Sequence, residues 1–419
     1  MKIVVIGSGL LGVTSAYFLA KDGHEVTVLD RNDEVARSTS YANAGMLTPS
    51  MADPWNAPGV LGQLLRYLGR EDAPLLLRLS ALPGMVGWGL AFLANSRPEK
   101  FKANMHANLQ LSTYSLAVMR ELRETLGLSY DQITRGTLKI FRDGKALAAA
   151  TERFDALAQM GLEVRTLGRD EVVALEPALA DVRHAIVGGV HCPQDESGDA
   201  RRFTQELAQK ARDAGVKFGF GAAVTGFEHD ARRISAVMSG QQRHTADAFV
   251  VAAGSWSALL LKHLGISLPI RPVKGYSITV RTDAWTTPPQ LPVVDDALHI
   301  AATPMGNRLR VAGTAEFAGY DSTLTPSRVD NLFDLLLTIF PSFKPHLDRE
   351  QASPWTGFRP VSSDGVPQIG RLKFDNLYAN TGHGHLGWTL AAGSSRLLAD
   401  IVRGRSGEID RMPYDAERT

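Results

Sequence analysis

Three glycines lie close together near the start of the chain, between two apolar runs of residues. The run 2–6 is rich in β-branched residues, and the run 13–20 is mostly apolar. Between the runs stand Gly7, Ser8, Gly9, Leu10, Leu11 and Gly12. In this G-x-G-x-x-G spacing the first glycine permits a tight turn, the second lets backbone N–H groups approach a pyrophosphate, and the third lets the helix pack closely on the strand. The pattern predicts a helix whose N-terminus binds the phosphates of a dinucleotide.

A carboxylate follows the next predicted strand. Residues 25–29 form a short apolar run that ends in Asp30. At this place in a dinucleotide-binding unit, a carboxylate accepts hydrogen bonds from the ribose hydroxyls. These residues alone are equally compatible with a nicotinamide and a flavin dinucleotide.

Two later segments repeat the arrangement of strand, glycine turn and helix. Residues 246–252 form an apolar strand that runs into Ala253 and Gly254. The predicted strand 377–381 leads into a second turn and then an apolar helix over 390–402. That turn consists of Gly382, His383, Gly384, His385, Leu386, Gly387, Trp388 and Thr389. Because cofactors bind at the carboxyl ends of parallel strands, we expect both segments to lie near the dinucleotide. A helix N-terminus aimed at the cofactor would stabilise a reduced, anionic ring system.

Length and composition narrow the class of protein. A chain of 419 residues is long for a single core, so at least two domains are expected. Hydrophobic residues make up 44% and charged residues 21%, which are globular values. The 45 Lys and Arg balance the 44 Asp and Glu, so no nucleic-acid partner is predicted. The single cysteine, Cys192, excludes an intrachain disulfide and any metal site built from four cysteines of this chain, and no metal is predicted.

The remaining segments suggest how the site is framed. Residues 38–46 are small and polar, which is typical of a loop that passes close to a cofactor, although a surface loop has the same composition. Residues 268–342 show alternating strands and turns, which predict an antiparallel sheet in a second domain. Helical periodicity is seen in the segments 109–126, 147–160, 203–214 and 327–340.

The longest uncharged stretch, residues 79–96, allows two interpretations. One is a buried or irregular helix, since the stretch contains Pro83 and several glycines and is marginal in length for a membrane span. The other is peripheral contact with a membrane through Trp88 and Phe92, flanked by Arg78 and Arg97. The N-terminus enters a strand at once and shows no signal peptide. A cytoplasmic location is expected, peripheral at the inner face of the membrane if residues 79–96 contact lipid.

These motifs together resemble those of the FAD-dependent D-amino acid dehydrogenase small-subunit family, which has the D-amino-acid oxidase and glycine oxidase fold. The resemblance extends over essentially the whole chain. Besides the N-terminal glycine motif and the 380–389 turn, the motifs that carry it are Ala42-Asn43-Ala44-Gly45, Pro54-Trp55, Asp195-Glu196-Ser197-Gly198-Asp199, Lys274-Gly275-Tyr276-Ser277 and Trp355-Thr356-Gly357-Phe358-Arg359-Pro360.

The resemblance implies an α/β fold with two parts. A discontinuous, Rossmann-like FAD-binding domain is expected over 1–78, 165–262 and 350–419. An α+β substrate domain with a mainly antiparallel sheet is expected over 79–164 and 263–349.

The resemblance also assigns expected roles around FAD. Asp30 would hold the adenosine ribose and Arg31 the adenine end. Val224, Ala253 and Gly254 would flank the adenine side. The residues expected to line the pyrophosphate and the flavin are Ser38, Thr39, Ser40, Ala44, Gly45 and Met46. Residues 383–389 would lie at the flavin ring.

The reaction implied by the resemblance is the oxidation of a D-amino acid, with hydride passing from Cα to flavin N5. The imino acid is hydrolysed to a 2-oxo acid and ammonia, and the electrons go to a membrane quinone rather than to dioxygen. Arg359 is expected to bind the substrate carboxylate, since only arginine is always charged and bidentate; a structural salt bridge is the alternative. Tyr276 and Tyr320 are candidate hydrogen-bond donors to the same carboxylate, and the alternative is that they are half-buried tyrosines of a sheet. His383 could form a hydrogen bond with the substrate amine or with the flavin. No dedicated general base is required.

Substrate and acceptor remain open at this stage. The substrate could resemble D-alanine, or it could be D-proline or a hydroxy-D-proline. An oxygen-using oxidase of the glycine or sarcosine type and a non-catalytic flavin subunit of an electron-transfer complex are the alternatives.

Overall fold

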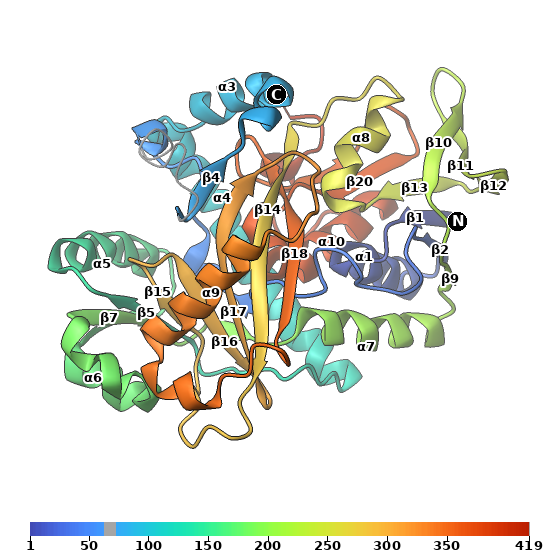
Figure 1. Cartoon of the computed structure of the whole chain (residues 1–419). Coiled ribbons are helices and arrows are strands. Elements are labelled where there is room, and N and C mark those ends of the chain that lie inside the picture. Colours follow the sequence, from blue (N-terminus) through green and yellow to red (C-terminus); the bar gives the residue numbers. More distant parts are fainter. Residues whose placement is uncertain (63–72, 419) are drawn as a thin grey trace.

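A computed structural model describes residues 1–62 and 73–418. One of its two large sheets has six strands in the order β19-β20-β13-β1-β2-β9. The strands are β1 (Lys2–Ile6), β2 (Glu25–Leu29), β9 (Lys217–Gly219), β13 (Ala248–Val251), β19 (Gln368–Arg371) and β20 (Leu377–Thr381). All neighbours are parallel except β19 and β20. The sheet therefore joins the first, the middle and the last parts of the chain (Figure 1).

Both faces of this sheet are buried. Ile3 and Val5 of β1 face a core formed by helices α1 (Leu10–Lys21), α4 (Pro98–Leu126), α7 (Ala200–Asp213) and α10 (Gly387–Arg403). Val4 and Ile6 face the opposite side, which is covered by α8 (Ser257–Lys262) and by a small sheet of β10 (Val224–His229), β11 (Ile234–Ser239) and β12 (Gln242–Thr245). Burial on both faces is why these strands are continuous apolar runs.

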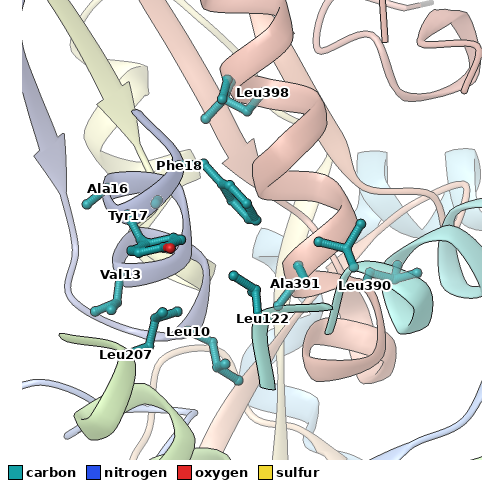
Figure 2. Packing of buried hydrophobic residues seen from close by; sticks show 14 of the residues in the cluster. Leu10, Val13, Ala16, Tyr17, Phe18, Leu122, Leu207, Leu390, Ala391 and Leu398 are labelled. Atoms are coloured by element: carbon teal, nitrogen blue, oxygen red, sulfur yellow. The ribbon is translucent and has the colours of Figure 1, made fainter. Parts of the chain in front are cut away.

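The helix after the N-terminal glycine turn packs directly on the last helix of the chain. Figure 2 shows Phe18 of α1 beside α10, with Leu122 of α4 close by. Burying a side chain of this size contributes about 1.5–3 kcal/mol. Residues from the far end of the sequence thus support the helix that follows the N-terminal glycine turn.

The second large sheet has nine strands and is mainly antiparallel, as expected. Its order is β18-β14-β17-β16-β15-β5-β7-β6, and β4 also pairs with β17. The strands are β4 (Leu75–Leu77), β5 (Thr137–Phe141), β6 (Arg165–Gly168), β7 (Gly188–Cys192), β14 (Ile270–Arg281), β15 (Val293–Asp295), β16 (Ile300–Met305), β17 (Arg308–Phe317) and β18 (Ser353–Ser362). Helix α9 (Pro326–Ile339) packs on β14 and β17, and α5 (Gly144–Gln159) and α6 (Arg169–Leu175) pack on the β5–β7 end (Figure 1).

Short elements complete the chain. Strands β3 (Met46–Leu47) and β8 (Glu196–Ser197) pair with each other. The 3₁₀ helices are Pro49–Met51, Leu79–Gly84, Pro177–Ala185, Gly254–Trp256, Pro341–His346, Gly384–Leu386 and Met412–Tyr414.

Strand pairing differs from the expected division of the chain at three places. The nine-stranded sheet includes four strands that lie in segments expected to belong to the FAD-binding domain. They are β4 in 1–78, β6 and β7 in 165–262, and β18 in 350–419. The largest difference is β18, which pairs with β14 over its whole length. Such partners lie far away in the sequence, and hydrophobic periodicity does not specify them.

Residues 79–96 form a 3₁₀ helix and then α3 (Val86–Ala94), as one of the two interpretations predicted. The other interpretation, in which Trp88 and Phe92 face a membrane, is wrong, because both are buried, and Trp88 Nε1 donates to the Val361 carbonyl at 3.2 Å. The outward side instead carries Leu82, Val86 and Leu90, which are 39%, 61% and 66% exposed. Over the described residues, every helix is too short or too polar to cross a bilayer.

Candidate active site

A cavity of about 1440 Å³ lies where the carboxyl ends of β1, β2, β13 and β20 approach strands β14, β17 and β18. It brings together most of the residues that the sequence singled out. The cofactor candidates on its wall are Gly7, Gly9, Leu10, Leu11, Asp30, Arg31, Ser38, Thr39, Ser40, Ala44, Gly45, Met46, Val224, Ala253, Gly254, Gly384, His385, Gly387 and Trp388. Of the catalytic candidates, Arg359, His383 and Tyr276 also line it.

Six of the candidate site residues do not line the cavity themselves. These are Ser8, Gly12, Gly382, Leu386, Thr389 and Tyr320. Gly12 has no room for a side chain, because an added Cβ would lie 1.8 Å from the Gly7 carbonyl oxygen. Thr389 Oγ1 accepts from the Thr48 backbone at 3.1 Å. These residues shape the turns without facing the cavity.

The N-terminal turn is built to receive an anion. Gly7 has φ +109°, which favours glycine, and an added Cβ would lie 2.6 Å from the Ala252 carbonyl oxygen. Gly9 caps α1 without any side-chain hydrogen bond. The Leu10 N–H donates to Ser40 Oγ at 3.1 Å. A helix start of this kind leaves the other N–H groups of its first turn for a ligand.

Asp30 is held in one orientation by both of its oxygens. Oδ2 accepts from the backbone N–H and the hydroxyl of Ser8, at 2.6 and 2.8 Å. Oδ1 accepts from the backbone and the side chain of Asn32, both at 2.8 Å. Asn32 also lines the cavity, and our sequence analysis missed it. An Asp followed two residues later by Asn is the signal that could have found it, since such pairs form Asx turns.

Arg31 and Trp256 contact each other on the cavity wall. The Arg31 guanidinium lies 4.2 Å from the centroid of the Trp256 ring. Trp256 in turn contacts Tyr320, with ring centroids 4.7 Å apart. This cation–π contact holds an exposed arginine beside the region where Val224 and Ala253 line the wall.

The small-residue loop 38–47 is tied to the nine-stranded sheet. Three hydroxyls make this connection at 2.7 Å each: Thr39 to the Phe358 carbonyl, Ser277 to the Ala42 carbonyl, and Thr303 to the Ala44 carbonyl. The loop is therefore fixed by the sheet that carries Arg359 and borders the cavity along its length.

Arg359 reaches across its own sheet. It lies on β18, and its Nη1 donates to the carbonyl of Thr314 on β17 at 3.2 Å, passing over Gly275 of β14. A Cβ at Gly275 would lie only 2.3 Å from Nη1, so this position leaves no room for a side chain. The ladder between β14 and β17 is irregular here, because Lys274 pairs with Glu316 while Tyr276 pairs with Gly313. Glycine and bulge together make the space that the guanidinium fills.

No acidic side chain in the described part of the chain pairs with Arg359. Burial lowers the pKa of its guanidinium to about 10, so it remains charged at neutral pH. Its Cζ lies 5.4 Å from the centroid of the Trp55 ring. A half-buried guanidinium without a counter-ion is suited to binding a carboxylate from the cavity.

Two histidines of the C-terminal turn are uncharged at neutral pH. Burial lowers the pKa of His383 to about 3, and its Nε2 lies 2.9 Å from Ser394 Oγ. Burial and the nearby Arg359 lower the pKa of His385 to about 4. The His385 ring stacks on Trp55, with centroids 5.2 Å apart. Neutral rings beside the cavity do not repel a cationic ligand.

The two candidate tyrosines do not direct their hydroxyls at Arg359. Tyr276 donates to Glu316 Oε2 at 2.6 Å, and its ring packs in the core under α9. Alternation along β14 is the reason, because Gly275 faces the guanidinium and its neighbour faces the other side of the sheet. Tyr320 donates to the Ser255 carbonyl at 2.8 Å and lies outside the cavity wall. The expectation that both donate to a substrate carboxylate is not supported by this geometry.

A family model for FAD dependent oxidoreductases (DAO) matches residues 2–401. The chain belongs to this family. Curated relatives of this FAD-dependent oxidoreductase include a D-amino acid dehydrogenase of Allorhizobium ampelinum, 43% identical over 100% of the chain and 98% of that protein. Another is the D-amino acid dehydrogenase of Bradyrhizobium diazoefficiens, 42% identical over 100% of the chain and 99% of that protein.

Solved structures confirm the fold of this oxidoreductase. The glycine oxidase of Geobacillus kaustophilus superimposes with a TM-score of 0.76 at 24% identity, covering 100% of the chain and 98% of that structure. The L-proline dehydrogenase of P. horikoshii does so with a TM-score of 0.77 at 20% identity, covering 99% and 96%.

The residues of the cavity fit FAD, the cofactor of the family. The uncapped start of α1 fits the pyrophosphate, and Asp30 stands at the end of β2 where a ribose is bound. At the other end, two buried polar atoms have no hydrogen-bond partner within the described residues, His383 Nδ1 and Trp388 Nε1. Buried polar atoms normally have a hydrogen-bond partner, and the polar ring of a bound cofactor would supply one.

Proposed function

We propose that this FAD-dependent oxidoreductase oxidises a D-amino acid to an imino acid, which water converts to a 2-oxo acid and ammonia. The observation that carries the proposal is the unpaired guanidinium of Arg359 on the same cavity wall as the cofactor turn. A free α-carboxylate is the group that such a guanidinium binds bidentately. The names of the relatives, which are D-amino acid dehydrogenases, support the substrate class.

FAD, when bound, supplies the acceptor for the hydride that leaves Cα. The chain supplies orientation. Arg359 fixes the carboxylate, and holding the reacting centre in place accounts for about 7–11 kcal/mol of the barrier. His383 is neutral, so it tolerates an approaching ammonium group, and its unpartnered Nδ1 is placed to bond the substrate amine or the flavin. The ammonium proton is lost to solvent before oxidation, and no side chain acts as a dedicated base.

The electrons pass to a quinone or to another acceptor that is not dioxygen. The name dehydrogenase, shared by the relatives, supports this choice. The preferred substrate is D-alanine-like, or it is D-proline or a hydroxy-D-proline.

The outward face of α3 provides a contact with a lipid surface. Val86 and Leu90 are exposed on it, and Leu82 lies on the preceding turn. Basic side chains border this segment. Arg271 donates to the Gly84 carbonyl at 2.9 Å, and Lys262 lines a small pocket together with Gly84 and Arg271. Apolar side chains flanked by cations suit the boundary of an anionic bilayer.

A panel of D-amino acids with a dye acceptor under anaerobic conditions tests the function, scored by kcat/KM. The panel includes D-alanine, D-proline and its hydroxylated forms, with the L-enantiomers, glycine and sarcosine for comparison. We expect D-amino acids to bleach the flavin and air to reoxidise it slowly. Fast reoxidation by air would identify an oxidase instead. Failure to reduce the dye with every D-amino acid would favour a non-catalytic flavin subunit.

A further inference from the structure

Two residues with unusual backbone conformations lie opposite each other on the cavity wall. Among the described non-glycine residues with positive φ, His299 (φ 52°) and Thr314 (φ 59°) line the cavity. The last register pair of β16 and β17 joins Ile300 to Gly313. His299 precedes that pair and Thr314 follows it, so the two residues occupy the next rung.

Thr314 is the more unusual of the two. A β-branched residue rarely adopts positive φ, and it does so only where its surroundings hold it there. Here it lies in the bulge opposite Gly275. The bulge is fixed from the other side, because the Ala315 N–H donates to the Pro74 carbonyl at 2.7 Å. Bulges of this kind re-aim a side chain, and they are common beside active sites.

The two polar groups of Thr314 have different partners. Its carbonyl accepts from Arg359 Nη1 at 3.2 Å. Its hydroxyl is buried and has no hydrogen-bond partner among residues 1–62 and 73–418. A buried hydroxyl is normally paired, so one left free on a cavity wall indicates a ligand.

We propose that Thr314 is a substrate-binding residue, whose hydroxyl donates a hydrogen bond to the carboxylate bound by Arg359. The inference rests on the proposed function, since it takes an α-carboxylate as the ligand. The carboxylate is favoured over the amine because the hydroxyl belongs to the residue whose carbonyl accepts from the Arg359 guanidinium. A guanidinium has five N–H donors and only one is used by the Thr314 carbonyl. A carboxylate has lone pairs enough to accept from the guanidinium and the hydroxyl together.

The backbone strain then has a use. Holding Thr314 at positive φ in a bulge presents its carbonyl to Arg359, while the residue itself lines the cavity. The carbonyl positions the cation and the hydroxyl contacts the ligand.

The test is a titration of the purified holoenzyme with propionate, followed by the flavin absorbance. Propionate has the carbon skeleton of alanine without the amine, so it binds without turnover. Thr314→Val keeps the shape and removes the hydroxyl, and we expect about tenfold or greater weakening of propionate binding. Thr314→Ser restores the hydroxyl and should bind within about twofold of the wild type. Thr338→Val, on the exposed side of α9, is the matched control and should not change binding.

A second variant protects the test against poor folding. Thr314→Gly removes the hydroxyl and also tolerates positive φ, so it should fold at least as well as the wild type and still bind propionate weakly. The inference is overturned if Thr314→Val binds propionate as the wild type does, if Thr314→Ser fails to restore binding, or if wild-type holoenzyme does not bind propionate.

Turnover separates this inference from the proposed function. For an active wild type, Thr314→Val should raise KM for D-alanine with little change in kcat, because the lost contact is made in both the ground and transition states. An unchanged KM would refute the role of Thr314 and leave the function intact. A wild type that oxidises no D-amino acid, with propionate binding that still depends on the hydroxyl, would refute the function and leave the carboxylate contact intact.

Discussion

Substituting Gly275 by alanine should disable the site without replacing any residue that is proposed to contact the substrate. Gly275 has no positive φ, so alanine suits its backbone. The new Cβ would lie 2.3 Å from Nη1, 2.6 Å from Cζ and 2.7 Å from Nη2 of Arg359. All three atoms belong to the guanidinium, so the clash falls on the proposed carboxylate anchor.

The size of the effect follows from these distances. Carbon and nitrogen atoms that are not bonded approach to about 3.5 Å, so the guanidinium must move by about 1 Å. A displacement of about 1 Å in a positioning group costs on the order of 100-fold in rate. We therefore expect Gly275→Ala to lower kcat/KM for the best D-amino acid about 100-fold, mostly through KM.

The assay is steady-state turnover with a dye acceptor, together with flavin content and melting temperature. Gly226→Ala is the matched control, because Gly226 lies in strand β10 with open space around it and no positive φ. The double variant Gly275→Ala/Arg359→Ala should be no worse than Arg359→Ala alone, since both changes act on one interaction. A Gly275→Ala enzyme within about threefold of the wild type would refute the idea that the guanidinium position matters.

Three further outcomes are expected. Arg359→Lys keeps the charge but loses the bidentate geometry of the guanidinium, so KM should rise about 10- to 100-fold. Arg359→Ala should raise KM further. Unchanged kinetics in either variant would exclude the carboxylate role. Asp30→Ala removes a charged acceptor and leaves the Ser8 N–H unpaired, so FAD should dissociate at least about tenfold more readily, as measured by flavin fluorescence after dialysis. Burial raises the pKa of the Asp195 carboxyl from 3.8 to about 6 in the folded protein. The protonated carboxyl therefore stabilises the fold at a pH below the unfolded-state pKa, and this stabilisation is lost as the pH rises through the folded-state pKa. The stability of the wild type relative to Asp195→Asn should fall by about 2 kcal/mol between pH 4 and pH 6, and a melting-temperature difference that is constant with pH would contradict this.

The cofactor half of the molecule was largely predictable from the sequence. Glycine spacing and the switch from strand to helix are local patterns, and they identified the turns at Gly7, Gly254 and Gly382, which the structure places at neighbouring strand ends. The matched family and the TM-scores confirm the fold that the resemblance implied. Strand β20 even begins and ends where the sequence predicted.

The substrate half was harder because its geometry depends on pairing between distant strands. Nothing local reveals that β18 pairs with β14, so neither the space made by Gly275 nor the bulge at Thr314 could be inferred. The role of Tyr276 stayed open between a carboxylate donor and a sheet tyrosine for the same reason, since the face on which it lies depends on the register. Two interpretations of Trp88 stayed open because an aromatic residue in an apolar helix suits a core as well as a lipid boundary.

The order of strands in the six-stranded sheet has a consequence for how the protein is made. β1 emerges first from the ribosome, yet the sheet is complete only when β20 pairs with β13 and α10 packs on α1. Until synthesis nears residue 403, one edge of β13 and the apolar face of α1 remain uncovered. These apolar surfaces are therefore exposed during synthesis, and the FAD site is complete only after β20 and α10 have been made. A premature stop before α10, which removes residues 387–419, should yield an aggregating product rather than a protein of lower activity.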